Sequence, residues 1–143
     1  MTETEIDPAS FRDPGGFVFR RAGRLYRQVN RSYADTYDTL MESGLHAQLV
    51  ERGLLLPHTQ IEVPAPRPQI AYKVLEPEPL AFVSYPYEWC FGQLKDAALI
   101  TLEIQKLAIR FGMSVKDASA FNIQFHRGKP ILIDTLSFEH LQE

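Results

Sequence analysis

The 143-residue sequence predicts a domain of the α+β class. Two observations lead to this prediction: β-type segments come in pairs separated by turn residues, and one long amphipathic helix stands between the early pairs and the last pair. The apolar fraction of 45% is that of an ordinary globular protein, which allows a hydrophobic core. Residues 1–14 are expected to form a flexible leader, and residues 15–143 a single folded domain.

A β-hairpin is predicted at the start of this domain. Residues 17–21 and 25–29 contain the aromatic and branched side chains that strands favour. The Ala22-Gly23 pair between them supplies a tight turn.

A pair of helices is predicted next, divided by Gly44. Asn30 or Ser32 is suited to cap the first helix, since short polar side chains bond the free N–H groups at a helix start. Apolar side chains of the first helix recur at helical spacing, at Tyr33, Tyr37, Leu40 and Met41. Those of the second are Leu45, Leu49 and Val50.

The middle of the chain is predicted to return to β structure. Residues 54–70 contain several prolines and are expected to form a connector with a short edge strand at 61–63. Residues 71–75 and 81–85 are predicted to be a second strand pair, joined by a turn at 76–79.

The longest predicted helix covers residues 91–111 and follows an aromatic linker at 85–89. Its predicted core face carries Ala97, Ile100, Ile104, Leu107, Ala108 and Phe111. Trp89 is expected to pack in the core, and Cys90 to be buried as a small hydrophobic side chain.

The candidate chemistry lies in the last part of the chain. Residues 121–125 and 130–134 predict a second hairpin, which would fold Asn122 and Asp134 back to one place. Asp117 precedes Asn122 by five residues in the same loop. Phosphoryl transfer needs one carboxylate near the attacking hydroxyl, and oxygen ligands that hold Mg²⁺ against the phosphates. Each residue taken alone has a simpler interpretation, as a turn residue or, for Asp134, as a cap of the following turn.

This layout resembles the catalytic loop and metal-binding Asp of protein kinases and aminoglycoside-phosphotransferase-like enzymes. The resemblance implies a truncated kinase-like domain: a small β-rich lobe with a helix pair, a hinge, a long helix, a catalytic-loop-like segment and a β-hairpin. It implies Asp117 as catalytic base, with Asn122 and Asp134 as metal ligands. Tyr85 and Glu88 would belong to the hinge, where an adenine ring binds.

Arg27 stands where a kinase has its phosphate-contacting Lys, and a guanidinium can bind phosphate with two hydrogen bonds. Arg20, Arg24 and Lys73 are weaker candidates for the same contact. The simpler interpretation of the arginines is a solvated face of the hairpin.

Several positions depart from the kinase pattern. Val115 stands where the catalytic loop has His, and Thr135-Leu136 follow Asp134 in place of Phe-Gly. A complete glycine-rich phosphate loop is lacking. The sequence therefore predicts a kinase-like fold that does not complete catalysis on its own.

A second resemblance covers nearly the whole chain. It is carried by residues 11–18, 25–30, 84–90 and 116–122. These runs are similar to the N-terminal region of a bacterial family of class I SAM-dependent methyltransferases, some of them nodulation-related. In that family a methyltransferase domain follows this region. This chain has no glycine-rich SAM motif, so the resemblance implies that SAM binds to a downstream domain.

Three functions are therefore expected. The first is an accessory domain of a methyltransferase that binds Mg-ATP, a small-molecule substrate or the partner domain. The second is a Mg-ATP-dependent phosphotransferase that uses Asp117, Asn122 and Asp134. The third is a dimerisation or docking module, with contacts at residues 57–68 or at the C-terminal end. An exposed apolar patch at Leu132, Leu136 and Phe138 would indicate a missing downstream domain.

Composition limits the partners and the compartment. The net charge of −3 with no basic stripe does not favour nucleic acid. No apolar run is long enough to span a bilayer, and the polar N-terminus is not expected to act as a signal peptide. A single cysteine agrees with a reducing, cytoplasmic setting. The scattered histidines have no metal-ligand spacing and are expected at the surface.

Overall fold

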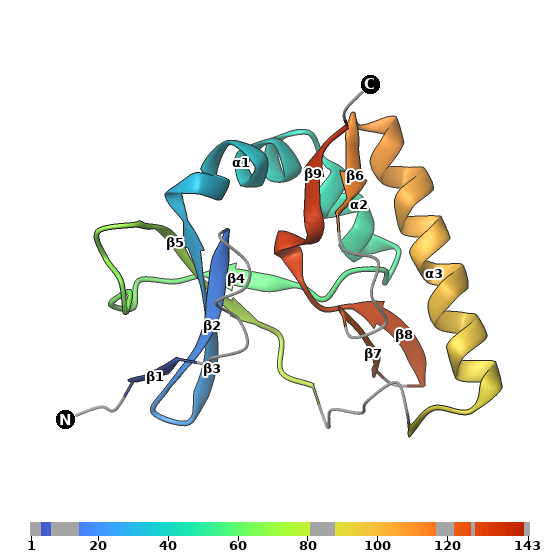
Figure 1. The fold of residues 1–143 in the computed structure, drawn as a ribbon, viewed down its shortest axis with the longest axis horizontal. Coiled ribbons are helices and arrows are strands. Elements are labelled where there is room, and N and C mark those ends of the chain that lie inside the picture. The colour runs from blue at the N-terminus through green and yellow to red at the C-terminus, as the bar shows by residue number, and fades with distance from the viewer. Residues whose placement is uncertain (1–3, 7–14, 81–87, 117–121, 127, 142–143) are drawn as a thin grey trace. The chain divides into compact units, whose positions relative to one another are not determined.

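The computed structural model describes residues 4–6, 15–80, 88–116, 122–126 and 128–141 (Figure 1). The fold is mixed α+β with antiparallel strands, which confirms the predicted class. The chain forms two compact units, residues 1–37 with 57–79 and residues 38–56 with 80–143. Each unit has an apolar cluster of its own.

The first unit contains a five-stranded antiparallel sheet in the order β1-β2-β3-β5-β4. The strands are β1 Thr4–Ile6, β2 Gly16–Arg21, β3 Arg24–Asn30, β4 His58–Gln60 and β5 Ala71–Pro77. The predicted first hairpin is confirmed as β2 and β3, with Ala22 and Gly23 at positive φ in the turn. β1 lies in the segment where no strand was predicted, since its three residues show no periodicity. The predicted edge strand at 61–63 is displaced: β4 ends at Gln60.

One face of this sheet carries the apolar cluster of the first unit. Phe17, Phe19, Tyr26 and Val74 are buried together, and Ile61, Val63 and Ala65 pack on them. Gln28 of β3 is fully buried. Both ends of its side-chain amide bind the backbone of the segment between β4 and β5, which also supplies Ile61, Val63 and Ala65. Its Oε1 accepts from the backbone N–H of Arg67, and its Nε2 donates to the backbone carbonyl of Arg67.

Two helices follow β3, as predicted. A single 3-10 turn, Arg31–Tyr33, leads into α1, Ala34–Glu42, and α2 spans Leu45–Glu51. The expected side-chain cap by Asn30 is absent, because its Oδ1 instead accepts from the Nε2 of Gln28. Gly44 between the helices has a φ of 92°, a conformation that residues with a side chain rarely adopt.

The long helix α3, Phe91–Arg110, confirms the prediction and packs in the second unit with the expected face inward. Trp89 is buried, and its ring lies edge-on to Phe125 at 5.0 Å between centroids. Cys90 is exposed, so the prediction of a buried thiol was wrong. It occupies the N-cap of α3, where its N–H donates to the Gln93 side chain.

Two strand pairs complete the second unit. The predicted hairpin is confirmed as β7, Ile123–His126, paired with β8, Lys129–Leu132. A pair that the sequence did not reveal joins β6, Met113–Val115, to β9, Phe138–His140. A 3-10 turn, Thr135–Ser137, lies between β8 and β9.

Leu132, Leu136 and Phe138 are all buried in the second unit, so they do not form the exposed apolar patch that would have indicated a missing downstream domain. The predicted strand at 81–85 lies outside the described residues. None of the helices within the described ranges combines the length and the apolar character that a membrane crossing requires.

Candidate functional site

The strand pairs of the second unit are nested. In chain order the hairpin of β7 and β8 lies between β6 and β9, and β6 pairs with β9. The loop from β6 to β7 and the segment from β8 to β9 therefore connect the same two strand pairs. The Lys116 N–H donates to the Ser137 carbonyl at 2.7 Å. At the other end, the Ile133 N–H donates to the Asn122 carbonyl at 2.9 Å. The loop between β6 and β7 is therefore held at both ends against the segment between β8 and β9.

This nesting brings together two of the residues that the sequence singled out. Asn122 directly precedes β7, and its carbonyl accepts the hydrogen bond from Ile133. Asp134 is the next residue after Ile133. Both side chains are partly exposed. The backbone of Asn122 is therefore bonded to Ile133, one residue before Asp134, and the role of the two side chains as metal ligands stays a prediction.

Asp134 also has a local structural role. Its Oδ1 accepts a hydrogen bond from the Leu136 N–H at 2.9 Å and so caps the turn that follows. The simpler interpretation of Asp134 as a turn cap is therefore confirmed. It does not exclude a metal, because an ionised carboxylate accepts about four hydrogen bonds or ligand contacts through its two oxygens.

The oxygen donors of this pair limit the kinds of metal that it could hold. Within the described ranges, no group of three or more His, Cys, Asp or Glu side chains is placed to hold a metal ion. Asn122 and Asp134 offer one amide oxygen and one carboxylate, which is too little for a closed protein cage. Mg²⁺ keeps several waters and takes one or two carboxylates together with phosphate oxygens. Asn122 and Asp134 would therefore leave most of the coordination of such an ion to water or to a bound ligand.

The remaining predicted residues of this region are placed only in part. Asp117 and Tyr85 lie outside the described residues. Glu88 is exposed just before α3. Val115, which replaces the kinase His, has a structural role: its side chain packs on the core, and its N–H donates to the Gln105 side chain at 2.7 Å.

The first unit collects cations on one face of its sheet. Arg27 lies opposite Leu75, and Val29 lies opposite Lys73, so Arg27 and Lys73 point to the same side of the sheet. Diagonal neighbours of this kind are about 7–8 Å apart, within reach of one ligand for long side chains. Arg24 belongs to the other side and forms an ion pair with Glu76 at 3.8 Å.

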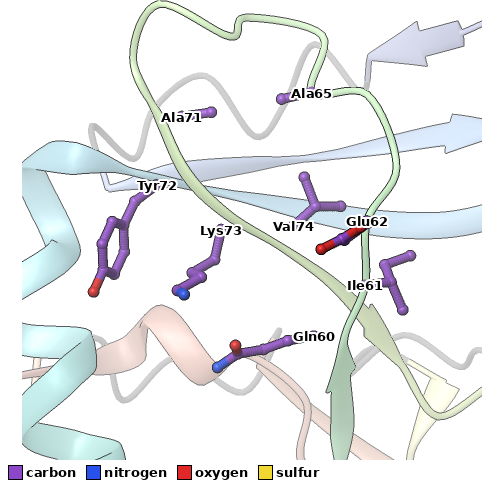
Figure 2. Close-up of a pocket in the computed structure, with 8 residues that line it drawn as sticks. All are labelled: Gln60, Ile61, Glu62, Ala65, Ala71, Tyr72, Lys73 and Val74. Atoms are coloured by element: carbon purple, nitrogen blue, oxygen red, sulfur yellow. The ribbon is translucent and has the colours of Figure 1, made fainter.

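A hollow of about 430 Å³ lies beside β5 in the same unit (Figure 2). Its lining residues come from the end of β4, the segment after it and the first half of β5: Gln60, Ile61, Glu62, Ala65, Ala71, Tyr72, Lys73 and Val74. Lys73 lies over the Tyr72 ring, with 5.2 Å from its Nζ to the ring centroid. The hollow therefore presents one cation stacked on an aromatic ring, with an acid and an amide nearby.

A buried phenol next to this hollow was missed by the sequence analysis. The Tyr37 hydroxyl accepts a hydrogen bond from the Gln60 Nε2 at 2.8 Å and lies 3.1 Å from the His58 Nε2. His58 is partly buried, in contrast to the surface position that was expected. No local pattern could have revealed this network, because Tyr37 and His58 are 21 residues apart in the sequence.

Comparison with known proteins gives one informative match. No protein-family model matches the chain. Over 133 residues, the chain is 35% identical to nodulation protein NoeA of Rhizobium meliloti (strain 1021). The match covers 91% of this chain but 27% of the relative, so the chain spans about a quarter of that protein's length. The expected likeness to a nodulation-related bacterial protein is confirmed to this extent.

Proposed function

We propose that this chain is a kinase-like accessory domain that binds a magnesium–nucleotide complex as part of a longer protein. The nested strand pairs are the observation that supports it most. They bring the loop after β6 and the segment after β8 together, and they hold Asn122 beside the residue that precedes Asp134. The proposal requires that the side chains of Asn122 and Asp134 share one metal ion, and this backbone arrangement supports it.

The chemistry of this pair supports a nucleotide over a free metal. Two oxygen ligands bind Mg²⁺ weakly, and phosphate oxygens supply the rest of the coordination. In this proposal Asn122 and Asp134 would hold the magnesium ion, which would neutralise part of the negative charge of the phosphates. Arg27 with Lys73 as a phosphate contact, and Tyr85 with Glu88 as adenine contacts, stay predictions of the sequence.

The longer protein would be a SAM-dependent methyltransferase by the second resemblance, and its SAM site would lie outside this chain. The length of NoeA supports a longer parent protein, and the printed name of that relative suggests a part in nodulation. Under this proposal the domain serves the parent protein by binding a ligand and does not transfer a group itself.

Isothermal titration calorimetry with ATP tests the proposal. The chain is expected to bind ATP in the presence of Mg²⁺, and to lose most of this affinity when EDTA removes the ion. Asp134→Asn retains the oxygen that caps the Leu136 N–H but removes the carboxylate charge, so the affinity should fall about tenfold or more. The matched control is Glu139→Gln, which removes an exposed charge on β9 and should leave the affinity unchanged.

Two results would contradict this function. If ATP binds equally well with EDTA, or if Asp134→Asn binds as tightly as the unaltered chain, the pair does not hold a metal. If the chain transfers phosphate from ATP and Asp117→Asn abolishes the transfer, the phosphotransferase alternative replaces the accessory role.

A further inference from the structure

The hollow beside β5 is lined by polar side chains whose bonding capacity is not used up (Figure 2). Lys73 extends from β5, Glu62 from the segment after β4, and Gln60 is the last residue of β4. Among the described residues, neither the Lys73 ammonium nor the Glu62 carboxylate has a hydrogen-bond or ion-pair partner. The Gln60 Nε2 donates to the Tyr37 hydroxyl, and the Gln60 Oε1 accepts no hydrogen bond within the same ranges. The hollow therefore offers a ligand one cation and two acceptors.

A buried tyrosine positions two of these side chains. Tyr37 is 1% exposed, and its hydroxyl holds the Gln60 Nε2 at 2.8 Å. The Tyr37 ring lies edge-on to the Tyr72 ring, with 6.4 Å between their centroids. The Lys73 Nζ lies 5.2 Å from the centroid of the Tyr72 ring. Because the amide and the ammonium are held by groups that contact Tyr37, ordering them around a ligand costs little side-chain entropy.

Lys73 and Gln60 are close enough to bind one small molecule. Gln60 lies opposite Leu75, and Lys73 precedes Leu75 by two residues, so both side chains point to the same side of the sheet. Diagonal neighbours of this kind are about 7–8 Å apart. The volume of about 430 Å³ lies toward the lower end of the range for small-molecule sites, which is about 300–1,000 Å³. The hollow therefore suits a small metabolite.

The hollow contains opposite charges, which narrows the class of ligand. Lys73 attracts an anionic group, and the acid at Glu62 disfavours a ligand with two or more negative charges, such as a phosphate ester. The Glu62 carboxylate and the Gln60 Oε1 accept hydrogen bonds, and an ammonium group supplies three donors. A small molecule with one carboxylate and one ammonium group therefore matches all three side chains.

We propose that this hollow binds a zwitterionic amino acid. Its carboxylate pairs with Lys73, and its ammonium donates to Glu62 and to the Gln60 Oε1. Ile61 and Val74 line the same hollow and supply apolar contacts to the amino-acid side chain. The site is separate from the proposed magnesium–nucleotide site, because none of its residues belongs to the candidate metal pair.

Thermal unfolding and calorimetry test the class of ligand. Each proteinogenic L-amino acid is added at millimolar concentration, and at least one should raise the melting temperature, because a ligand that binds only the folded chain stabilises it. Isothermal titration calorimetry then compares this amino acid with its amide, which lacks the carboxylate, and with its N-acetyl derivative, which lacks the ammonium. Each derivative should bind about tenfold more weakly or less, because a charged hydrogen bond is lost. The proposal is overturned if no amino acid stabilises the chain, or if both derivatives bind as tightly as the amino acid.

Two variants test the assignment of the side chains. Lys73→Met removes the charge, so it should bind the amino acid about tenfold more weakly and should no longer distinguish it from its amide. Glu62→Gln should reduce the discrimination against the N-acetyl derivative. The matched control is Lys95→Met, which removes an exposed charge on α3 and should bind as the unaltered chain does. Unchanged discrimination in both Lys73→Met and Glu62→Gln would show that the hollow is not the binding site.

A third variant separates this site from the proposed nucleotide site. Asp134→Asn should leave the affinity for the amino acid unchanged, and a loss of that affinity would show that the hollow is not a separate site. Mg-ATP is titrated into Lys73→Met in the same series. If this variant binds Mg-ATP more weakly and the amino acid as tightly as before, Lys73 contacts a phosphate and the proposal for the hollow is wrong.

Discussion

Replacing Ile104 by alanine should destabilise the chain far more than replacing Leu102, although both lie in the middle of α3. Ile104 is 1% exposed, whereas Leu102 is 61% exposed. Removing the buried carbons of Ile104 costs about 2.4 kcal/mol at about 0.8 kcal/mol per carbon. The cavity left in a core that relaxes incompletely raises the loss to about 3–4 kcal/mol. Leu102→Ala should stay within about 0.5 kcal/mol, since alanine is a good helix former and little apolar area is lost.

Urea denaturation followed by circular dichroism measures both free energies of unfolding. The slope of the free energy with urea should be the same in the two variants and in the unaltered chain, because the surface exposed on unfolding hardly changes. The reasoning is refuted if Leu102→Ala costs as much as Ile104→Ala. In that case Leu102 would already be covered in the isolated chain, and the inward face of α3 would be assigned incorrectly.

Two further predictions concern polar groups in the helices. Tyr37→Phe should lower the free energy of unfolding by about 1–2 kcal/mol, because it removes the hydroxyl that meets Gln60 and His58; an unchanged urea midpoint would contradict this network. Burial lowers the pKa of His46 in the folded chain. As the pH falls, the unfolded chain therefore takes up this proton first. The free energy of unfolding should fall below about pH 6.5 and level off below the pKa that His46 has in the folded chain. His46→Gln should reduce this drop between pH 7 and pH 5, and equal pH profiles for the two proteins would show that His46 does not contribute.

The locally encoded parts of the fold were predicted well. The β2–β3 hairpin, the helix pair and α3 with its core face follow from turn residues and from the spacing of apolar side chains. The errors fall where a structure depends on distant partners. β6 and β9 are three residues each and lie more than twenty residues apart, so neither has a periodicity that reveals its pairing.

The candidate site shows the same division. The sequence supplied the two residues of the proposed magnesium site, Asn122 and Asp134, on either side of a turn signal. It could not show that β6–β9 pairing closes the loop at its other end, between Lys116 and Ser137. Nor could it place Lys73 beside Arg27, because β3 and β5 become neighbours only in the assembled sheet.

The sequence by itself determined that α3 is a helix with an apolar face, since the side-chain period of 3.6 residues is a property of the chain alone. Only the tertiary structure decided which apolar residues of α3 are core and which remain at the surface. Ile104 and Leu102 are equally hydrophobic in the sequence, and packing against the neighbouring strands buries one and leaves the other in water. The physical reason is that burial depends on the position of a side chain relative to elements that are distant in sequence.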